Sequence, residues 1–106
     1  MIKLKIYHDG GDGITQASLE YWKEIKDPKW RIHQVTCSKD SGIFNTEIDC
    51  FDDDYNLIVV MLSGLSCGYG GTGPHGLETL LKDIGAPPEV SSKAFYNDVV
   101  IYNPRW

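Results

Sequence analysis

The sequence predicts an α+β fold in which a mostly antiparallel sheet of about five strands carries two helices on one face. Three observations support this class: short segments alternate apolar and polar residues, two longer segments repeat apolar residues at helical spacing, and clusters rich in Gly, Pro and Asp separate them. A chain of 106 residues is long enough for one hydrophobic core, so residues 1–106 are expected to form a single domain.

The first predicted elements are a strand and a helix. Apolar residues alternate over 2–6, and the glycine-rich turn 8–13 ends this strand. The helix is expected to have Thr15 as its N-cap and to end near Lys26, just before Pro28. Its buried stripe is expected to contain Leu19, Trp22 and Ile25.

Three strands are predicted next, over 30–37, 43–50 and 55–63. A polar turn joins the first two, which favours a hairpin. The third is the most hydrophobic and is expected to be central in the sheet. The residues expected to share one face of the first strand are Trp30, Ile32, Gln34 and Thr36.

A second helix and a last strand complete the predicted fold. Apolar residues at i, i+3, i+4 and i+7 predict the helix, and Gly85 followed by Pro87 and Pro88 marks its end. The last strand is predicted over 94–102. The stripe of this helix consists of Leu77, Leu80, Leu81 and Ile84.

Composition and charge argue against several classes of function, including nucleic-acid binding, membrane insertion and zinc or redox sites. Fifteen acidic residues against ten basic ones give a net charge of -5, which disfavours binding to a nucleic acid polymer. The longest strongly apolar run, 57–62, is too short to span a bilayer, and no signal-peptide core is visible. The three cysteines match no zinc or redox motif. A cytoplasmic protein with free thiols and no cofactor is the simplest interpretation.

The feature most relevant to function is a glycine-dense loop over 66–76, with five glycines in nine consecutive residues. Glycine permits positive φ and lets a ligand approach the main chain without meeting a Cβ. Pro74 suits the first position of the helix that follows. The amides of His75, Gly76 and Leu77 are therefore expected to face the loop and to form an anion site. The alternatives are a purely structural strand-to-helix crossover and a catalytic loop.

Side chains of the same loop extend the predicted site. Thr72 offers a hydroxyl, His75 a partly charged donor, and Tyr69 an aromatic face or a phenol. No Lys-Ser/Thr pair follows the last glycine, which excludes a P-loop, and the context does not fit a dinucleotide-binding fingerprint. The predicted ligand-binding residues are Tyr69, Gly70, Gly71, Thr72, Gly73, His75, Gly76 and, as an added cation, Arg105.

The segment Gly68-Tyr69-Gly70-Gly71-Thr72-Gly73-Pro74, followed by Leu77 and Leu80-Leu81, resembles a G-Y-G-G-S/T-G-P-x-x-L segment. Small uncharacterised proteins of phages, plasmids and bacteria carry that segment. The resemblance covers about fifteen residues and implies no catalytic chemistry. It implies a mobile-element setting, where small acidic proteins often inhibit host defence. One such group, the viral sponges, sequesters nucleotide immune signals such as cyclic ADP-ribose isomers or cyclic oligonucleotides, commonly with a second subunit completing the pocket.

The function expected from residues and resemblance together is non-catalytic binding and sequestration of a phosphate-bearing nucleotide, as a phage-type anti-defence protein. A homodimer or higher homo-oligomer is compatible with this function, and no membrane or metal is required. The alternative is a protein–protein inhibitor or immunity-type protein that acts through its acidic surface. A third class is a small enzyme that uses Cys67 or His75.

Two acidic turns and the C-terminal aromatic residues could each have a functional or an ordinary structural role. Asp9 and Asp12, with His8, and the turn 52–54 could bind a cation, but hydrogen-bonded turns are favoured at both places. The C-terminal aromatics are expected mostly to pack on the sheet, and the alternative is a subunit interface or a wall of the ligand site. They are Phe95, Tyr96, Tyr102 and Trp106.

Overall fold

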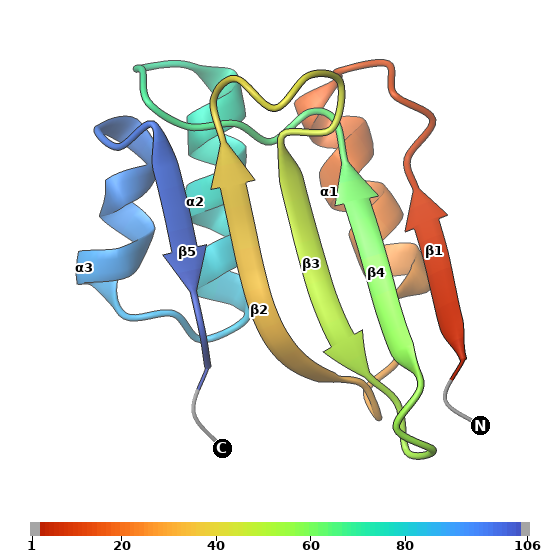
Figure 1. The fold of residues 1–106 in the computed structure, drawn as a ribbon. Coiled ribbons are helices and arrows are strands. Elements are labelled where there is room, and N and C mark those ends of the chain that lie inside the picture. Colours follow the sequence, from red (N-terminus) through yellow and green to blue (C-terminus); the bar gives the residue numbers. More distant parts are fainter. Residues whose placement is uncertain (1–2, 105–106) are drawn as a thin grey trace.

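The computed structural model describes residues 3–104, in which a sheet forms one layer and the helices the other (Figure 1). The predicted α+β class is confirmed. The strands are β1 (Leu4–His8), β2 (Arg31–Ser38), β3 (Thr46–Phe51), β4 (Leu57–Leu62) and β5 (Val99–Tyr102). The helices are α1 (Thr15–Ile25), α2 (Thr72–Asp83), the short α3 (Pro88–Ser91) and the 3-10 turn η1 (Ser92–Phe95). No helix among these residues is long and apolar enough to cross a membrane.

The strand order is β1-β4-β3-β2-β5, with β1 parallel to β4 and every other neighbouring pair antiparallel. The β2–β3 hairpin is confirmed, and β3 rather than β4 is the middle strand. Because β1 and β4 are parallel, both end at the same edge of the sheet. The chain leaves β1 for α1 and β4 for α2, so both helices also begin at that edge (Figure 1).

The core lies between the sheet and the helices. Alternate residues of β2, β3 and β4 are buried there, and the stripes of α1 and α2 pack against them. The opposite face of the sheet has no covering layer in the described part of the chain. Four of its apolar side chains are more than half exposed: Leu4, Ile6, Val99 and Ile101.

The pairing of β2 corrects one prediction. The register shifts between Ile32 and Gln34, so Ile32 lies opposite Cys50 and Gln34 lies opposite Asp49. Ile32 packs against the core, whereas Gln34 pairs with a residue of the uncovered face. The expectation that Trp30, Ile32, Gln34 and Thr36 share one face was wrong, because a β-bulge adds a residue and reverses the alternation.

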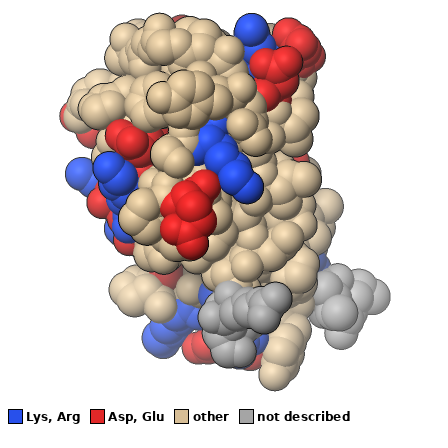
Figure 2. Space-filling model, turned by 90° about the vertical axis from the view of Figure 1, so that its left-hand side faces the viewer, with Lys and Arg blue, Asp and Glu red and all other residues tan. Residues whose placement is uncertain are grey.

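The C-terminal segment corrects a second prediction. The strand expected over 94–102 starts only at Val99, and α3 and η1 occupy 88–95. Pro88 stands at the start of α3, where its missing N–H costs nothing, and Ala94 is fully buried. On the side that carries α3 and β5, charges of both signs are interspersed among uncharged residues (Figure 2).

Both ends of α2 follow from local chemistry. The predicted C-terminus is confirmed: Gly85 has φ +91°, its N–H donates to Lys82 O, and the Ala86 N–H donates to Leu81 O. This is the Schellman pattern. The N-terminus lies earlier than predicted, at Thr72, so Pro74 is the third helical residue instead of the first.

Candidate functional site

The glycine-dense loop and the β1–α1 turn meet where β1 and β4 end. Together with the β2–β3 hairpin loop they surround a cavity of about 540 Å³, called here the loop cavity. The three segments lie along the upper edge of the sheet in Figure 1. The residues that line the cavity are Gly13, Thr15, Lys39, Asn45, Ser63, Gly64, Ser66, Tyr69, Gly71, Thr72 and Gly73.

Asp9 joins the two strand–helix connections. One carboxylate oxygen accepts hydrogen bonds from the Ser63 N–H (2.8 Å) and from the Ser18 hydroxyl, and the other accepts from the Ser63 hydroxyl (2.8 Å) and the Gly11 N–H (3.1 Å). The Ser18 hydroxyl in turn accepts from the Gly64 N–H at 2.8 Å. One carboxylate thus fixes the relative positions of two loops that are far apart in the sequence.

The electrostatics of Asp9 favour the ionised form. Burial alone would raise the pKa of this carboxyl, but the hydrogen bonds from Ser18, Ser63 and Gly11 outweigh burial and hold the pKa below its usual value of 3.8. Asp12 has a local role, since it accepts from the Ile14 N–H at 3.2 Å. These turns are hydrogen-bonded Asx-type turns, as favoured from the sequence.

The loop between β4 and α2 is anchored at three points. The buried Thr46 hydroxyl donates to Leu65 O (2.9 Å), and the Gly68 N–H donates to Ala94 O (2.9 Å). The Cys67 thiol donates to Asp98 O at 3.3 Å. The loop therefore has a defined position before any ligand is considered.

The packing explains most of the glycines in this loop. Gly68 has φ +87°, which L side chains rarely adopt. A Cβ on Gly73 would strike the Ser66 hydroxyl and approach the Tyr69 hydroxyl, and one on Gly71 would lie 2.9 Å from the Tyr69 ring.

Two further glycines stand at opposite extremes. A Cβ on Gly76 would strike the Thr15 methyl group, so this residue permits the close approach of α2 to α1. Of the glycines in this loop, only Gly70 would carry a Cβ with no other atom within 4 Å. The glycine density is therefore largely a consequence of packing, and by itself it does not require a ligand.

The start of α2 corrects the predicted set of backbone donors. The His75 N–H donates to Gly71 O (3.1 Å) inside the helix, and so cannot face a ligand. The free amides of the first turn are those of Thr72 and Gly73, because a helix offers its first N–H groups no carbonyl one turn earlier. Both residues line the loop cavity.

Hydroxyl groups and one ammonium group supply the side-chain chemistry of the cavity. The Ser66 and Tyr69 hydroxyls are 2.7 Å apart and hydrogen-bonded, and Thr72 adds a third hydroxyl. Lys39 is exposed and forms no ion pair within residues 3–104. The Asp98 carboxylate lies near the methylene groups of the Lys39 side chain. It does not line the cavity and forms no ion pair with the Lys39 ammonium group. No Asp or Glu is among the lining residues.

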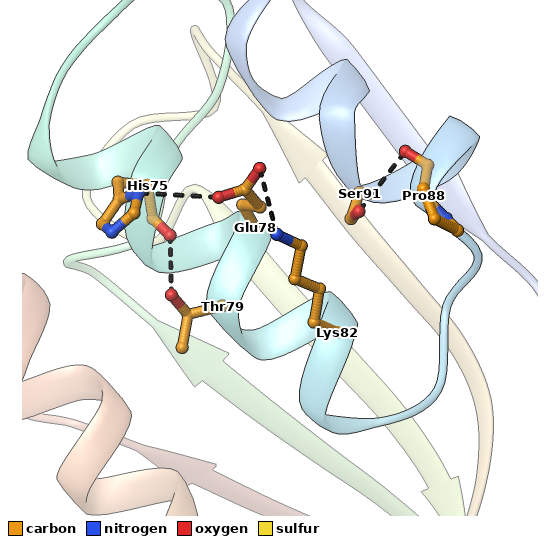
Figure 3. A network of polar contacts seen from close by, with 6 residues as sticks. All are labelled: His75, Glu78, Thr79, Lys82, Pro88 and Ser91. Carbon is orange, nitrogen blue, oxygen red and sulfur yellow. Dashed lines mark hydrogen bonds and ion pairs between the residues drawn. The ribbon is translucent and has the colours of Figure 1, made fainter.

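His75 and Gly76 lie outside the loop cavity. They line an adjoining groove of about 330 Å³ between α1 and α2, which shares Thr15 and Thr72 with the cavity. His75 Nδ1 lies 3.5 Å from Glu78, which also pairs with Lys82 at 3.6 Å (Figure 3). The charge of His75, where present, is thus directed at Glu78. Arg105 lies outside the described residues, as does Trp106.

The geometry weighs against Cys67 as a nucleophile. The side chain is fully buried, and burial raises the pKa of its thiol. Burial also raises the pKa of Cys37 and of Cys50, in both cases to about 12. Within residues 3–104 no three His, Cys, Asp or Glu side chains are placed to hold a metal ion, and the 52–54 turn is closed by hydrogen bonds from Asp54 and Asn56 to Asp52.

The structure brings four of the predicted ligand residues to the cavity: Tyr69, Gly71, Thr72 and Gly73. Sequence reasoning missed Lys39 and Asn45, which reach the cavity only through the β2–β3 hairpin. The Asn45 amide donates to Ser38 O (3.0 Å) and Lys39 O (3.1 Å) and so holds this loop in place. A polar hairpin turn was visible in the sequence, but its position beside the glycine loop was not.

No protein-family model matches this chain, and no curated protein or solved structure does so either.

Proposed function

We propose that the protein binds and sequesters a small phosphate-bearing nucleotide, with its phosphate in the loop cavity. One observation carries this proposal. In a chain with net charge -5, the lining of this cavity contains a lysine, several hydroxyls and two free helix amides, and no carboxylate. Such donors match the oxygens of a phosphate, which accept hydrogen bonds and carry negative charge.

The helix dipoles support an anion at this place. Both α1 and α2 begin beside the cavity, and neither has an acidic residue in its first turn, although 15 acids occur in the chain. The last turns do carry the complementary charge, with Lys23 in α1 and Lys82 in α2. The Asp9 carboxylate accepts from the Ser18 hydroxyl and the Asp12 carboxylate accepts from the Ile14 N–H, so the start of α1 already has anions of the protein beside it. Among the described residues no carboxylate accepts from the first amides of α2, so an external anion would complement that helix end.

The size and ionisable groups of the site favour binding over chemistry. A cavity of about 540 Å³ is within the range of small-molecule sites, and the adjoining groove gives a further 330 Å³ for the remainder of a nucleotide. The lining of the cavity contains no Asp, Glu, His or Cys, the side chains that most often act as a general base or as an activated nucleophile.

The test is a binding measurement with a matched pair of lysine variants. The purified protein is titrated calorimetrically with inorganic phosphate, nucleoside mono- and diphosphates, cyclic dinucleotides and cyclic ADP-ribose isomers. Lys39→Met should raise the dissociation constant of the ligand that binds most tightly by at least about tenfold, because a charge-assisted hydrogen bond is lost. Lys3→Met changes the net charge equally and lies at the other end of β1, so it should bind like the wild type.

Recovery of the bound molecule separates sequestration from turnover. The complex is denatured by heat and the released ligand is analysed. Intact ligand supports sequestration, and altered ligand would indicate an enzyme. If no member of the panel binds, or if both lysine variants lose affinity equally, the proposed site is wrong. Gly73→Val is a poor test, because its side chain would collide with Ser66 whether or not a ligand binds.

A protein-binding function is the second candidate, and the uncovered face of the sheet favours it. Exposed aliphatic residues lie on its edge strands, and Glu47 and Asp49 lie on its middle strand. This arrangement suits a partner with basic and apolar residues. Such an inhibitor would tolerate Lys39→Met and lose its partner on substitution of Asp49.

A further inference from the structure

The outer edge of β1 carries backbone groups that no strand or turn of residues 3–104 pairs with. The Leu57 N–H donates to Lys3 O at 3.0 Å, so the backbone of Lys3 faces β4. Successive residues of a strand direct their backbone groups to opposite edges. The N–H and C=O groups of Leu4 and Ile6 therefore face away from the sheet, on the side where β1 has no neighbouring strand.

His8 is the third residue of β1 with an outward-facing backbone. The Tyr21 hydroxyl of α1 lies within reach of the His8 N–H, so this donor already has a partner in its own chain. The His8 C=O has no hydrogen bond within the part of the chain that the structure describes. The edge thus offers free donors and free acceptors in one short strand.

The side chains at this edge are apolar. Leu4 and Ile6 are 58% and 59% exposed, although both are large aliphatic residues. They lie on the uncovered face of the sheet, opposite the half-buried Leu57 and Val59 of β4. A strand added beside β1 would therefore cover apolar surface and also pair the backbone.

The two edges of the sheet differ in what lies beside them. In Figure 1 the helix layer reaches beyond β5, where α3 lies, whereas none of the described helices lies beyond β1. A second copy added beside β5 would bring two α3 helices together across the axis. A second copy added beside β1 meets no such obstacle.

We propose that two copies of this chain associate through β1, as an antiparallel strand pair about a two-fold axis at Ile6. In this register Ile6 lies opposite Ile6 of the second copy, and Leu4 lies opposite His8. Each Ile6 N–H donates to Ile6 O of the other copy, and each Leu4 N–H donates to His8 O. The same few residues supply both donors and acceptors, which is the self-complementarity that a two-fold interface requires.

Lys5 selects this register. Lysine at a sheet edge usually discourages pairing, and an axis at Lys5 would place two like charges directly opposite each other. The axis at Ile6 places Lys5 opposite Tyr7 of the second copy instead. In its own chain Lys5 already lines a cleft with the acidic turn 52–54, on the helix side of the sheet.

The contact is small, and this sets its expected strength. One strand pair with two aliphatic side chains from each copy is below the size of a standard stable interface, so we expect a reversible dimer with a Kd on the order of 10–100 μM. No residue of β1 lines the loop cavity, so dimerisation stands or falls independently of nucleotide binding.

The experiment is sedimentation velocity on the full chain between about 5 μM and 1 mM, with a matched pair of proline variants. Ile6→Pro removes an outward N–H and leaves the pairing with β4 intact. Its Kd for dimerisation should be at least about tenfold higher than that of the wild type. Ile101→Pro is the control, because Ile101 is 55% exposed on the other edge strand, and its Kd should be unchanged.

Amide hydrogen exchange in the wild-type protein tests the same contact without a substitution, and decides the question if Ile6→Pro does not fold. The amides of Leu4 and Ile6 should exchange rapidly in dilute protein and slow down as the concentration rises through the Kd. Those of Val99 and Ile101, on the opposite edge, should exchange at the same rate throughout.

Three results would overturn the proposal. One is a chain that stays monomeric up to about 1 mM. Another is equal weakening of the dimer by the two proline variants, which would indicate that β1 of one copy pairs with β5 of the next. The third is a dimer in which the amides of Leu4 and Ile6 exchange as rapidly as in the monomer, which would place the interface elsewhere.

Discussion

Replacing Asp9 with Asn tests whether one carboxylate holds the two strand–helix connections together. The carboxylate accepts four hydrogen bonds, two of them from the Ser63 amide and hydroxyl and one from the fully buried Ser18. A hydrogen bond to a charged group contributes about 1.5–3 kcal/mol. Asn keeps one accepting oxygen and places its NH₂ group among hydrogen-bond donors. Because the site is partly exposed, the resulting loss of stability is reduced. We expect Asp9→Asn to lower the free energy of unfolding by about 2–3 kcal/mol at pH 7.

The assay is urea denaturation of both proteins between pH 7 and pH 2.5. The folded state lowers the pKa of Asp9 below 3.8, so its stabilisation is present in full well above pH 3.8 and is lost as the pH falls below that value. The difference between wild type and Asp9→Asn should therefore shrink at acid pH. Asp12→Asn is the control on the same turn and should cost less than about 0.5 kcal/mol, because Asp12 is exposed and accepts one bond. Equal losses for the two variants, or a difference independent of pH, would refute the assigned role of Asp9.

Three other predictions follow from packing and protonation. Gly64→Ala should cost at least about 2 kcal/mol in urea denaturation, because its Cβ would strike the turn before α1, whereas Gly70→Ala, with open space around it, should be nearly neutral. The Cys37 thiol, with its pKa raised to about 12, should react with a disulfide reagent at pH 8 only in denaturant; prompt reaction of the folded protein would contradict its burial. A hydrogen bond to Asp49, and then burial, raise the pKa of Glu47 from 4.5 to about 7, so stability should fall as the pH rises through this window. Glu47→Gln should be more stable than wild type by about 1 kcal/mol at pH 8 and not at pH 4, after allowance for exposure; equal differences at both pH values would contradict the raised pKa of Glu47.

The elements that the sequence predicted well are those set by local chemistry. The α1 helix ends within a residue of its predicted end, and Gly85 ends α2 by the expected pattern of hydrogen bonds. Alternation or strong hydrophobicity predicted a strand at each of the five observed strands, although the last was predicted to start five residues too early. The start of α2 was missed because Thr72 and Gly73 are poor helix formers, and the apolar stripe begins only at Leu77.

The errors in the sheet and the C-terminal segment have non-local causes. The bulge in β2 depends on how that strand pairs with β3, and nothing in the alternation around Ile32 reveals an added residue. The predicted strand over 94–102 included Ala94 and Phe95, yet η1 contains both residues and Ala94 is fully buried against α2 through this helical turn. Tertiary packing overrode the local pattern there.

The position of the candidate site could be predicted from the sequence, but only some of its residues could. Glycine density directed attention to a loop that does line a cavity, although packing against Tyr69, Ser66 and Thr15 accounts for most of that density. The stronger argument for a ligand, a cavity without carboxylates at two helix starts, required the parallel pairing of β1 with β4. That pairing joins strands more than 50 residues apart in the sequence, and the hydrogen bonds that Ser63 donates to Asp9 likewise join residues that are 54 positions apart.

The same topology reconciles an acidic chain with an anion site. Net charge is a sum over the whole surface. It governs the approach of large polyanions, because many of their phosphates must contact the protein at once. A small anion meets only the local field of the loop cavity, to which the helix termini, Lys39 and the nearby Asp9 carboxylate all contribute. Because β1 and β4 run in parallel, both helices start at the same edge of the sheet. Asp9 and Asp12 contact the start of α1, whereas the start of α2 faces a cavity lining that contains no carboxylate. If the proposed function holds, we expect an acidic exterior with such an interior to discriminate by size, excluding a nucleic acid and admitting a nucleotide.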